Sequence, residues 1–291
     1  MIRLPKLPRL PRPVVMGLKL LLTVAAAWIL YRKLDWQRLE QVWQAAEHWL
    51  LVPTFLAIVA SKAASVPRLG LHLAAAGCPI GWRENARLYL AGLFYSLFLP
   101  GGIGGDGYKA YWLHRQYGQP VSKLVVALFL DRLSGLLALG LWTLILFWAS
   151  GLPSKLQWEP PYLVMAGALV LGAGVWVRSL LWSVVVQGFQ LLGAWLLLLA
   201  LGLHVHQLLY LLVFLASSVV STVVPVTLGG VGSRELVFAY AAEVLPLAKD
   251  ASVLVAFLFF LLSALLSFSG VYYVYRSDRI AASNSKGAQK S

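Results

Sequence analysis

Two glycine-rich stretches hold the residues of this chain that could do chemistry. Residues 98–111 read FLPGGIGGDGYKAY, and residues 223–240 read VVPVTLGGVGSRELVFAY. Each stretch has a proline, then paired glycines, then a basic residue, which is Lys109 in the first and Arg234 in the second. Proline cannot continue a helix, and glycine allows backbone conformations closed to other residues. Each stretch therefore predicts a helix, a break and a second helix.

The start of the second helix in each stretch has the chemistry of an anion site. Its first N–H groups have no partner within the helix, and the helix dipole is positive there. Lys109 and Arg234 each add a full positive charge close to that point. Two such breaks facing one cavity would bind a phosphate headgroup. The alternative is that the glycines only let helices pack closely, as they often do in membranes. Two matching copies favour the binding site.

Four further charged residues are candidates for the same site. Asp106 either caps the helix that begins beside it or acts directly in substrate or proton coupling. Glu235 points in a different direction from Arg234, so it can hold a cation from another element. Asp131 and Arg132 lie well inside an apolar run, where charges usually face a bundle interior or a cavity. The alternative for this pair is an ion pair that holds two helices together.

Composition indicates which elements must position these residues. The chain has 291 residues, of which 60% are hydrophobic and only 12% are charged, whereas a soluble domain has about 25% charged residues. Several apolar runs reach the ~20 residues that a membrane helix needs. The predicted fold class is all-α, a polytopic membrane protein of about six spans. The spans are expected at residues 14–31, 49–71, 122–149, 162–177, 180–203 and 251–275. Residues 32–48 predict an amphipathic helix in the membrane interface, and residues 72–85 are expected to form a polar loop.

The distribution of Lys and Arg predicts the orientation. We place the N-terminus in the cytoplasm and let each glycine stretch enter and leave the membrane on one side. Most basic residues, Arg68 among them, then lie on the cytoplasmic side, as the positive-inside rule requires. The stretches are therefore predicted to be re-entrant broken-helix hairpins, inside residues 86–117 and 207–246. Each half then has an odd number of spans, so the halves form an inverted repeat, as in many transporters.

This topology divides the chain into two membrane repeats between two tails. The predicted parts are a basic cytoplasmic tail at 1–13, a first membrane repeat at 14–149, a second, inverted membrane repeat at 162–275 and a polar tail at 276–291. Both termini are expected in the cytoplasm of a multi-pass protein of the cell inner membrane.

Several functional classes are disfavoured. The net charge of +13 is scattered between apolar runs, which argues against a nucleic-acid partner. The single Cys78 excludes an internal disulfide and a cysteine-ligated metal. His204 and His206 have no carboxylate or cysteine nearby and make a poor metal site. The chain has no HExxH motif, P-loop or GxSxG motif. We expect no metal, no cofactor and no enzymatic activity.

At LPGGIGGDGYKAY, FLDRLSGLLAL and VPVTLGGVGSRELVFAY, the chain resembles the flippase-like family named for the transmembrane region of lysylphosphatidylglycerol synthase. The resemblance covers roughly residues 14–276. It implies a lipid-handling membrane domain that moves anionic or modified phospholipids, or lipid-linked glycans, between leaflets. The residues that it singles out for substrate binding are Pro100, Gly101, Gly102, Gly104, Gly105, Asp106, Lys109, Asp131, Arg132, Gly229, Gly230, Gly232, Arg234 and Glu235.

The resemblance has one departure. Full-length lysyl-lipid synthases carry a soluble aminoacyl-transferase domain after the membrane part, whereas this sequence ends soon after the last predicted span. We therefore expect a stand-alone membrane domain without synthase activity.

The leading hypothesis is a lipid translocator whose partner is a membrane lipid with an anionic or polyprenyl-phosphate headgroup. Asp106, Asp131 and Glu235 are its candidate proton carriers. One alternative is an intramembrane enzyme acting on a lipid phosphate, with Asp106 or Glu235 as acid–base group. Another is a non-catalytic subunit of a separate glycosyltransferase or synthase.

Overall fold

The computed structural model describes residues 36–98, 104–151, 174–223 and 233–274, and all regular elements in these parts are helices. Four of them are long and apolar enough to cross a membrane: His48–Ala75, Val121–Ala149, Trp176–Ala200 and Lys249–Val274. They confirm the predicted all-helical, multi-pass membrane protein. The predicted span at 14–31, most of the one at 162–177 and both tails lie outside the described residues.

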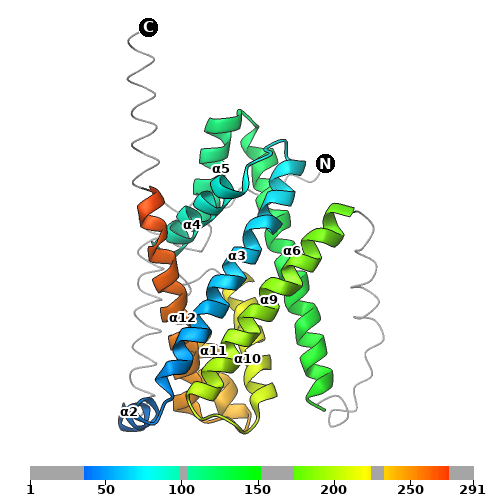
Figure 1. Ribbon diagram of the computed structural model, residues 1–291. Coiled ribbons are helices and arrows are strands. Elements are labelled where there is room, and N and C mark those ends of the chain that lie inside the picture. Colours follow the sequence, from blue (N-terminus) through cyan, green and yellow to red (C-terminus); the bar gives the residue numbers. More distant parts are fainter. Residues whose placement is uncertain (1–35, 99–103, 152–173, 224–232, 275–291) are drawn as a thin grey trace, which may run out of the picture.

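The described helices fall into long helices and shorter ones (Figure 1). Their bounds are α2 (Trp36–Gln44), a 3-10 turn η1 (His48–Leu50), α3 (Leu51–Ala75), α4 (Trp82–Phe98), α5 (Gly104–Tyr117), α6 (Val121–Ala149), α9 (Gly174–Ala200), α10 (Gln207–Val223), α11 (Ser233–Val244) and α12 (Lys249–Phe268). In Figure 1, α3, α6, α9 and α12 run along the length of the molecule. The labels α4 and α5 lie near its upper end, and α10 and α11 lie near its lower end.

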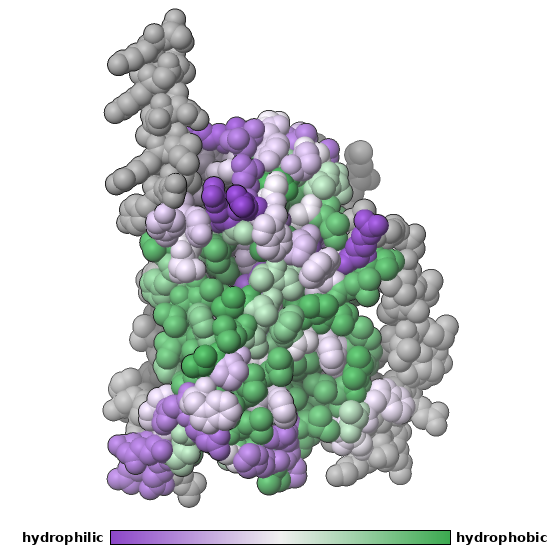
Figure 2. All heavy atoms as spheres, viewed as in Figure 1, coloured by the Kyte–Doolittle hydropathy of each residue, from purple (hydrophilic) through white to green (hydrophobic). Residues whose placement is uncertain are grey.

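The surface explains why this sequence needs a membrane. Figure 2 shows a broad apolar band between two hydrophilic ends on the viewed face. Large apolar side chains such as Phe129, Leu181 and Leu265 are exposed on the long helices. A soluble protein rarely exposes so wide an apolar patch. Lipid chains can cover this surface because its side chains are apolar. The backbone loses no hydrogen bonds there, because helices satisfy them internally.

Two apolar cores support the two glycine stretches. One core packs α9, α10, α11 and α12 together, with Phe214 and Phe259 in an edge-to-face contact of 4.7 Å between ring centroids. The other packs α3, α4, α5 and α6 around Leu69, Leu113 and Leu124. The helices on either side of the first glycine stretch, α4 and α5, therefore share one core, and those on either side of the second, α10 and α11, share the other, to which α3 and α6 also contribute.

The structure corrects the sequence around the end of α3. Residues 72–85 were predicted to be a polar loop, but α3 continues to Ala75 and α4 begins at Trp82. Arg68, which the sequence counted among the cytoplasmic cations, lies buried within α3, and its side of the membrane stays a prediction. Pro67 is also inside this helix, which continues past it. The reason for the burial of Arg68 is a carboxylate partner on α6, described below.

Cys78 offers a simple test of packing at this end of the molecule. Its side chain is fully buried, and this burial raises the pKa of the thiol, although Lys123 opposes the shift. Only the thiolate reacts with maleimide, so a raised pKa slows the reaction at neutral pH. We expect Cys78 to react roughly tenfold more slowly than a cysteine placed at exposed Gln116 in a Cys78→Ser background, with a rate that rises as pH rises. Equal rates would contradict the buried placement.

Candidate functional site

Small residues bring α4 and α5 into close contact. A Cβ atom at Gly105 would overlap the carbonyl oxygen of Gly92 and the hydroxyl of Ser96, whereas a Cβ at Gly107 would meet nothing within 4 Å. Gly105 therefore acts in packing, as the alternative interpretation of the glycines expected. Gly104 is the first residue of α5.

Several of the predicted binding residues lie outside the described part of the chain: Pro100, Gly101, Gly102, Gly229, Gly230 and Gly232. Their part in binding an anion stays a prediction.

One carboxylate and two cations meet beside the first glycine stretch. The first turn of α5 places Asp106, and Lys109 follows one turn later with its Nζ 3.3 Å from Asp106 Oδ1. Arg132, on α6, forms an ion pair with Asp106 Oδ2 through its Nε atom. Lys109 also lies over the ring of Tyr89, with 4.9 Å from Nζ to the ring centroid. Asp106, Lys109 and Arg132 are called the α5–α6 charge cluster below.

The α5–α6 charge cluster has the electrostatics of an anion site. Two positive charges share one carboxylate, and that carboxylate lies in the first turn of a helix, where negative charge is favoured. The side chain of Lys109 is 10% exposed, whereas that of Arg132 is 36% exposed. Arg132 therefore forms the accessible side of the cluster. A phosphate oxygen could compete with Asp106 for these cations, because charge-assisted hydrogen bonds to phosphate are strong.

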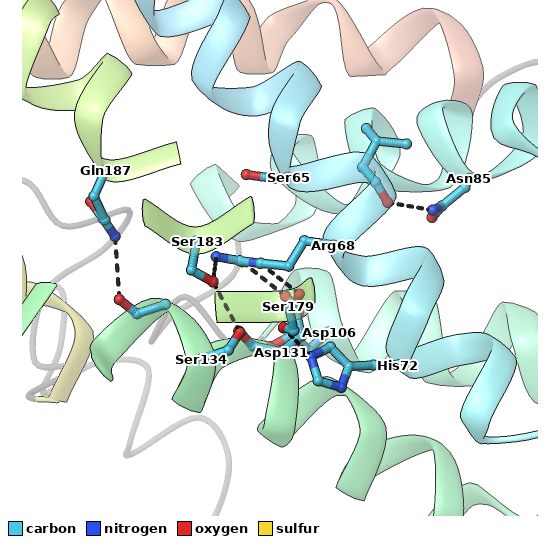
Figure 3. Close-up of polar contacts among 12 residues, drawn as sticks. Ser65, Arg68, His72, Asn85, Asp106, Asp131, Ser134, Ser179, Ser183 and Gln187 are labelled. Atoms are coloured by element: carbon cyan, nitrogen blue, oxygen red, sulfur yellow. Dashed lines mark hydrogen bonds and ion pairs between the residues drawn. The ribbon is translucent and has the colours of Figure 1, made fainter. Parts of the chain in front are cut away.

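Asp131 belongs to a different ion pair. Both of its carboxylate oxygens accept hydrogen bonds from Arg68 on α3, at 2.8 Å from Nε and 3.1 Å from Nη2 (Figure 3). Both side chains are buried. This is the helix-linking ion pair that the sequence left as an alternative for Asp131. The separate partner of Arg132 shows that the two neighbours on α6 act on two different helices.

Serine hydroxyls extend the buried pair to α9. Arg68 Nη1 donates to Ser183 Oγ at 3.3 Å, and Ser183 donates to Ser134 Oγ at 3.2 Å. One turn away, His72 Nε2 and Ser179 Oγ share a hydrogen bond of 2.7 Å. Figure 3 shows these side chains gathered between α3, α6 and α9. Such hydrogen bonds hold membrane helices together where lipid offers no partner.

Arg234 lies in a second cluster that involves other helices. Its Nη2 donates to Ser218 Oγ on α10 at 3.1 Å. Its guanidinium carbon lies 4.8 Å and 5.0 Å from the ring centroids of Phe214 and Phe259. Glu235, the next residue, is buried in α11. The contacts of Arg234 described here are with α10 and α12, so its sharing of one cavity with Lys109 stays a prediction.

Sequence reasoning missed the role of Arg68 and His72. Both lie on α3, one turn apart, and both are buried. A signal was present, because Arg68 falls inside the apolar run predicted as a span, and charges inside spans usually have a buried partner. The partner itself, Asp131, is 63 residues away in the chain. No local pattern could identify it.

Comparison with known families agrees with this architecture. Residues 16–177 match the family model described as the lysylphosphatidylglycerol synthase TM region. The chain belongs to this family. A search of curated proteins finds no match. The family is a membrane domain related to lipid handling, and the matched region contains the whole α5–α6 charge cluster. Arg234 and Glu235 lie beyond it.

Proposed function

We propose that this member of the lysylphosphatidylglycerol synthase TM region family binds an anionic lipid headgroup at the α5–α6 charge cluster and moves that lipid between leaflets. The observation that carries the proposal is the sharing of one carboxylate, Asp106, by two cations at the start of α5. Charged residues at membrane depth usually mark a substrate or ion pathway. The chain belongs to a lipid-handling family, and a phosphate-bearing headgroup is a substrate that two cations would bind strongly.

The ion pairs with Asp106 would be exchanged for pairs with phosphate. Before binding, Asp106 balances part of the positive charge of Lys109 and Arg132. A phosphate oxygen arriving from the side of Arg132 replaces Asp106 as its partner. Lys109, which is more buried, then holds the second oxygen. The released Asp106 carboxylate becomes able to take a proton, which would couple lipid movement to protons. No nucleotide-binding motif occurs in the sequence, so movement is passive or ion-coupled.

The short helices support the predicted hairpins. The helices α4 and α5 have 17 and 14 residues, and α10 and α11 have 17 and 12, fewer than the ~20 that cross a bilayer. Members of each pair pack against each other, and the pairs lie towards opposite ends of the molecule in Figure 1. Two re-entrant hairpins in an inverted repeat would have this arrangement. Cytoplasmic termini and an inner-membrane location belong to the same proposal.

The second hairpin would provide the site on the other side. Arg234 at the start of α11 corresponds to Lys109 in the repeat and lies against Ser218. Rocking of one half against the other would expose the two cationic sites in turn. A headgroup would thus pass from one cluster to the other.

The first test is mass spectrometry of lipids that co-purify with the protein. We compare wild type, the Lys109→Ala/Arg234→Ala variant and a matched control, Lys249→Ala, which removes a cation from an exposed pair with Glu243. We expect one anionic lipid to be enriched in wild type and in the control, and to be lost in the double variant. Liposome assays of that lipid would then measure movement between leaflets. No enrichment in wild type, or enrichment that survives the double variant, would overturn the proposal.

A further inference from the structure

We propose that Arg68 is a positioning residue for the headgroup site. By holding both carboxylate oxygens of Asp131, it leaves the neighbouring Arg132 to pair with Asp106 at the α5–α6 charge cluster. The expected effect of Arg68 on lipid binding rests on the proposed function. The expected effect of Arg68 on the Asp106–Arg132 ion pair can be measured without lipid.

The Arg68–Asp131 contact is specific in geometry. The guanidinium donates from Nε and Nη2 to the two oxygens of one carboxylate, which is the fork arrangement that arginine makes and lysine cannot. Its remaining terminal nitrogen donates to Ser183 on α9. Both charged side chains are buried, so each charge depends on the other for stability. Both oxygens of the Asp131 carboxylate thereby accept a hydrogen bond from α3.

The surroundings keep this arrangement in place. Gly135, one turn after Asp131 on α6, leaves room for the guanidinium, because a Cβ there would lie 3.1 Å from Arg68 Nη1. Ser134 donates to the backbone carbonyl of Asp131 at 2.8 Å and accepts from Ser183. Arg68 is therefore held by two helices besides its own.

The Arg68–Asp131 pair matters to the α5–α6 charge cluster because Asp131 and Arg132 are adjacent on α6. Consecutive helix residues point in different directions, so α6 reaches α3 through Asp131 and α5 through Arg132. Without Arg68, a buried carboxylate would lack its counter-ion, which is strongly unfavourable. Arg132 is the adjacent cation, and its side chain is long and partly exposed. The uncompensated charge of Asp131 would attract the Arg132 guanidinium without forming a direct pair, and this attraction would weaken the pairing of Arg132 with Asp106.

The direct test measures the coupling between positions 106 and 132. Asp106→Asn, Arg132→Gln and the combined variant form a double-mutant cycle, read as the non-additivity of the thermal melting shifts in detergent. We run this cycle in wild type, in Arg68→Gln and in Arg68→Gln/Asp131→Asn. We expect clear coupling in wild type, a loss of at least about half of it in Arg68→Gln, and its return when Asp131 is also neutralised. A purely structural role for Arg68 would lower every melting temperature and leave the coupling unchanged.

A second variant keeps the test decisive if Arg68→Gln does not fold. Arg68→Lys keeps the positive charge but cannot hold both oxygens of Asp131. We expect a smaller but measurable fall in the coupling between positions 106 and 132. Unchanged coupling in every folded background would overturn the proposal.

A lipid-binding experiment distinguishes the failure of this inference from the failure of the proposed function. Purified wild type and Arg68→Gln are titrated with short-chain phosphatidylglycerol, with inorganic phosphate and with short-chain phosphatidylcholine as a neutral control. We expect wild type to bind the anionic lipid and the variant to bind it roughly tenfold more weakly, the scale seen when a residue that orients a ligand-binding group is removed. Binding of inorganic phosphate with equal loss would assign the site to phosphate in general. If wild type binds none of these probes, the proposed function fails, while the coupling cycle still decides the role of Arg68.

Discussion

The Gly105→Ala variant is expected to lose the properly packed α4–α5 pair, whereas Gly107→Ala is expected to keep it. A methyl group at position 105 would overlap the backbone carbonyl of Gly92, which has no flexible atoms to move aside. The helices would have to separate. Because α5 carries Asp106 and Lys109, the α5–α6 charge cluster would separate with it. We expect little monodisperse protein after size exclusion, and loss of co-purified anionic lipid in whatever remains.

The comparison with Gly107 isolates this contact. Both glycines lie in the first turn of the same helix, so alanine brings the same gain in helix propensity at each, up to about 1 kcal/mol. A Cβ at Gly107 meets nothing within 4 Å. We therefore expect Gly107→Ala to match or slightly exceed wild type in yield and melting temperature. Equal behaviour of the two variants would show that the close approach at Gly105 is not needed.

The second large effect is expected at Asp131. Asp131→Asn leaves the buried guanidinium of Arg68 without its counter-ion, which typically costs about 3–5 kcal/mol. The matched control is Glu243→Gln, because Glu243 and Lys249 form an ion pair at 3.1 Å whose side chains are 42% and 33% exposed. A solvent-exposed pair of this kind contributes only about 0–1 kcal/mol. Chemical unfolding in detergent, followed by helical circular dichroism, measures both.

Neutralising both partners distinguishes an unpaired charge from lost packing. The Arg68→Gln/Asp131→Asn variant has no buried charge at this place, so it is expected to be more stable than either single variant. A double variant with the summed loss of the two singles would show that the ions do not depend on each other. A small effect of Asp131→Asn alone would contradict the buried pair itself.

The helices themselves were largely predictable. A run of apolar residues long enough for a bilayer must be helical, because only internal hydrogen bonding satisfies its backbone there. The sequence therefore located α3, α6 and α12 within a few residues. It was wrong about the start of α9, which begins at Gly174 and continues through the break predicted between the spans at 162–177 and 180–203. It misjudged residues 72–85, where α3 continues to Ala75 and α4 begins earlier than expected, at Trp82. Polar residues such as His72 look like a loop in sequence, although a serine hydroxyl on α9 satisfies this one.

The candidate site was predictable in its members but only partly in its arrangement. The sequence selected Asp106, Lys109 and Arg132, and the structure brings these three together. It placed Asp131 in the same site, but the carboxylate of Asp131 faces Arg68 instead. Neighbouring residues on a helix point in different directions, so their partners depend on which helices pack on each side.

By itself, the sequence determined that this is a helical membrane protein, and that it has two stretches of proline and glycine with a basic residue after each. These properties follow from composition and local backbone chemistry. Only the tertiary structure decided that Gly105 serves close packing, that Arg68 neutralises Asp131, and that Lys109 and Arg234 contact different helices. Each of these contacts joins residues that are distant in the chain. Which residues meet depends on how the helices pack and on the direction in which each side chain then points.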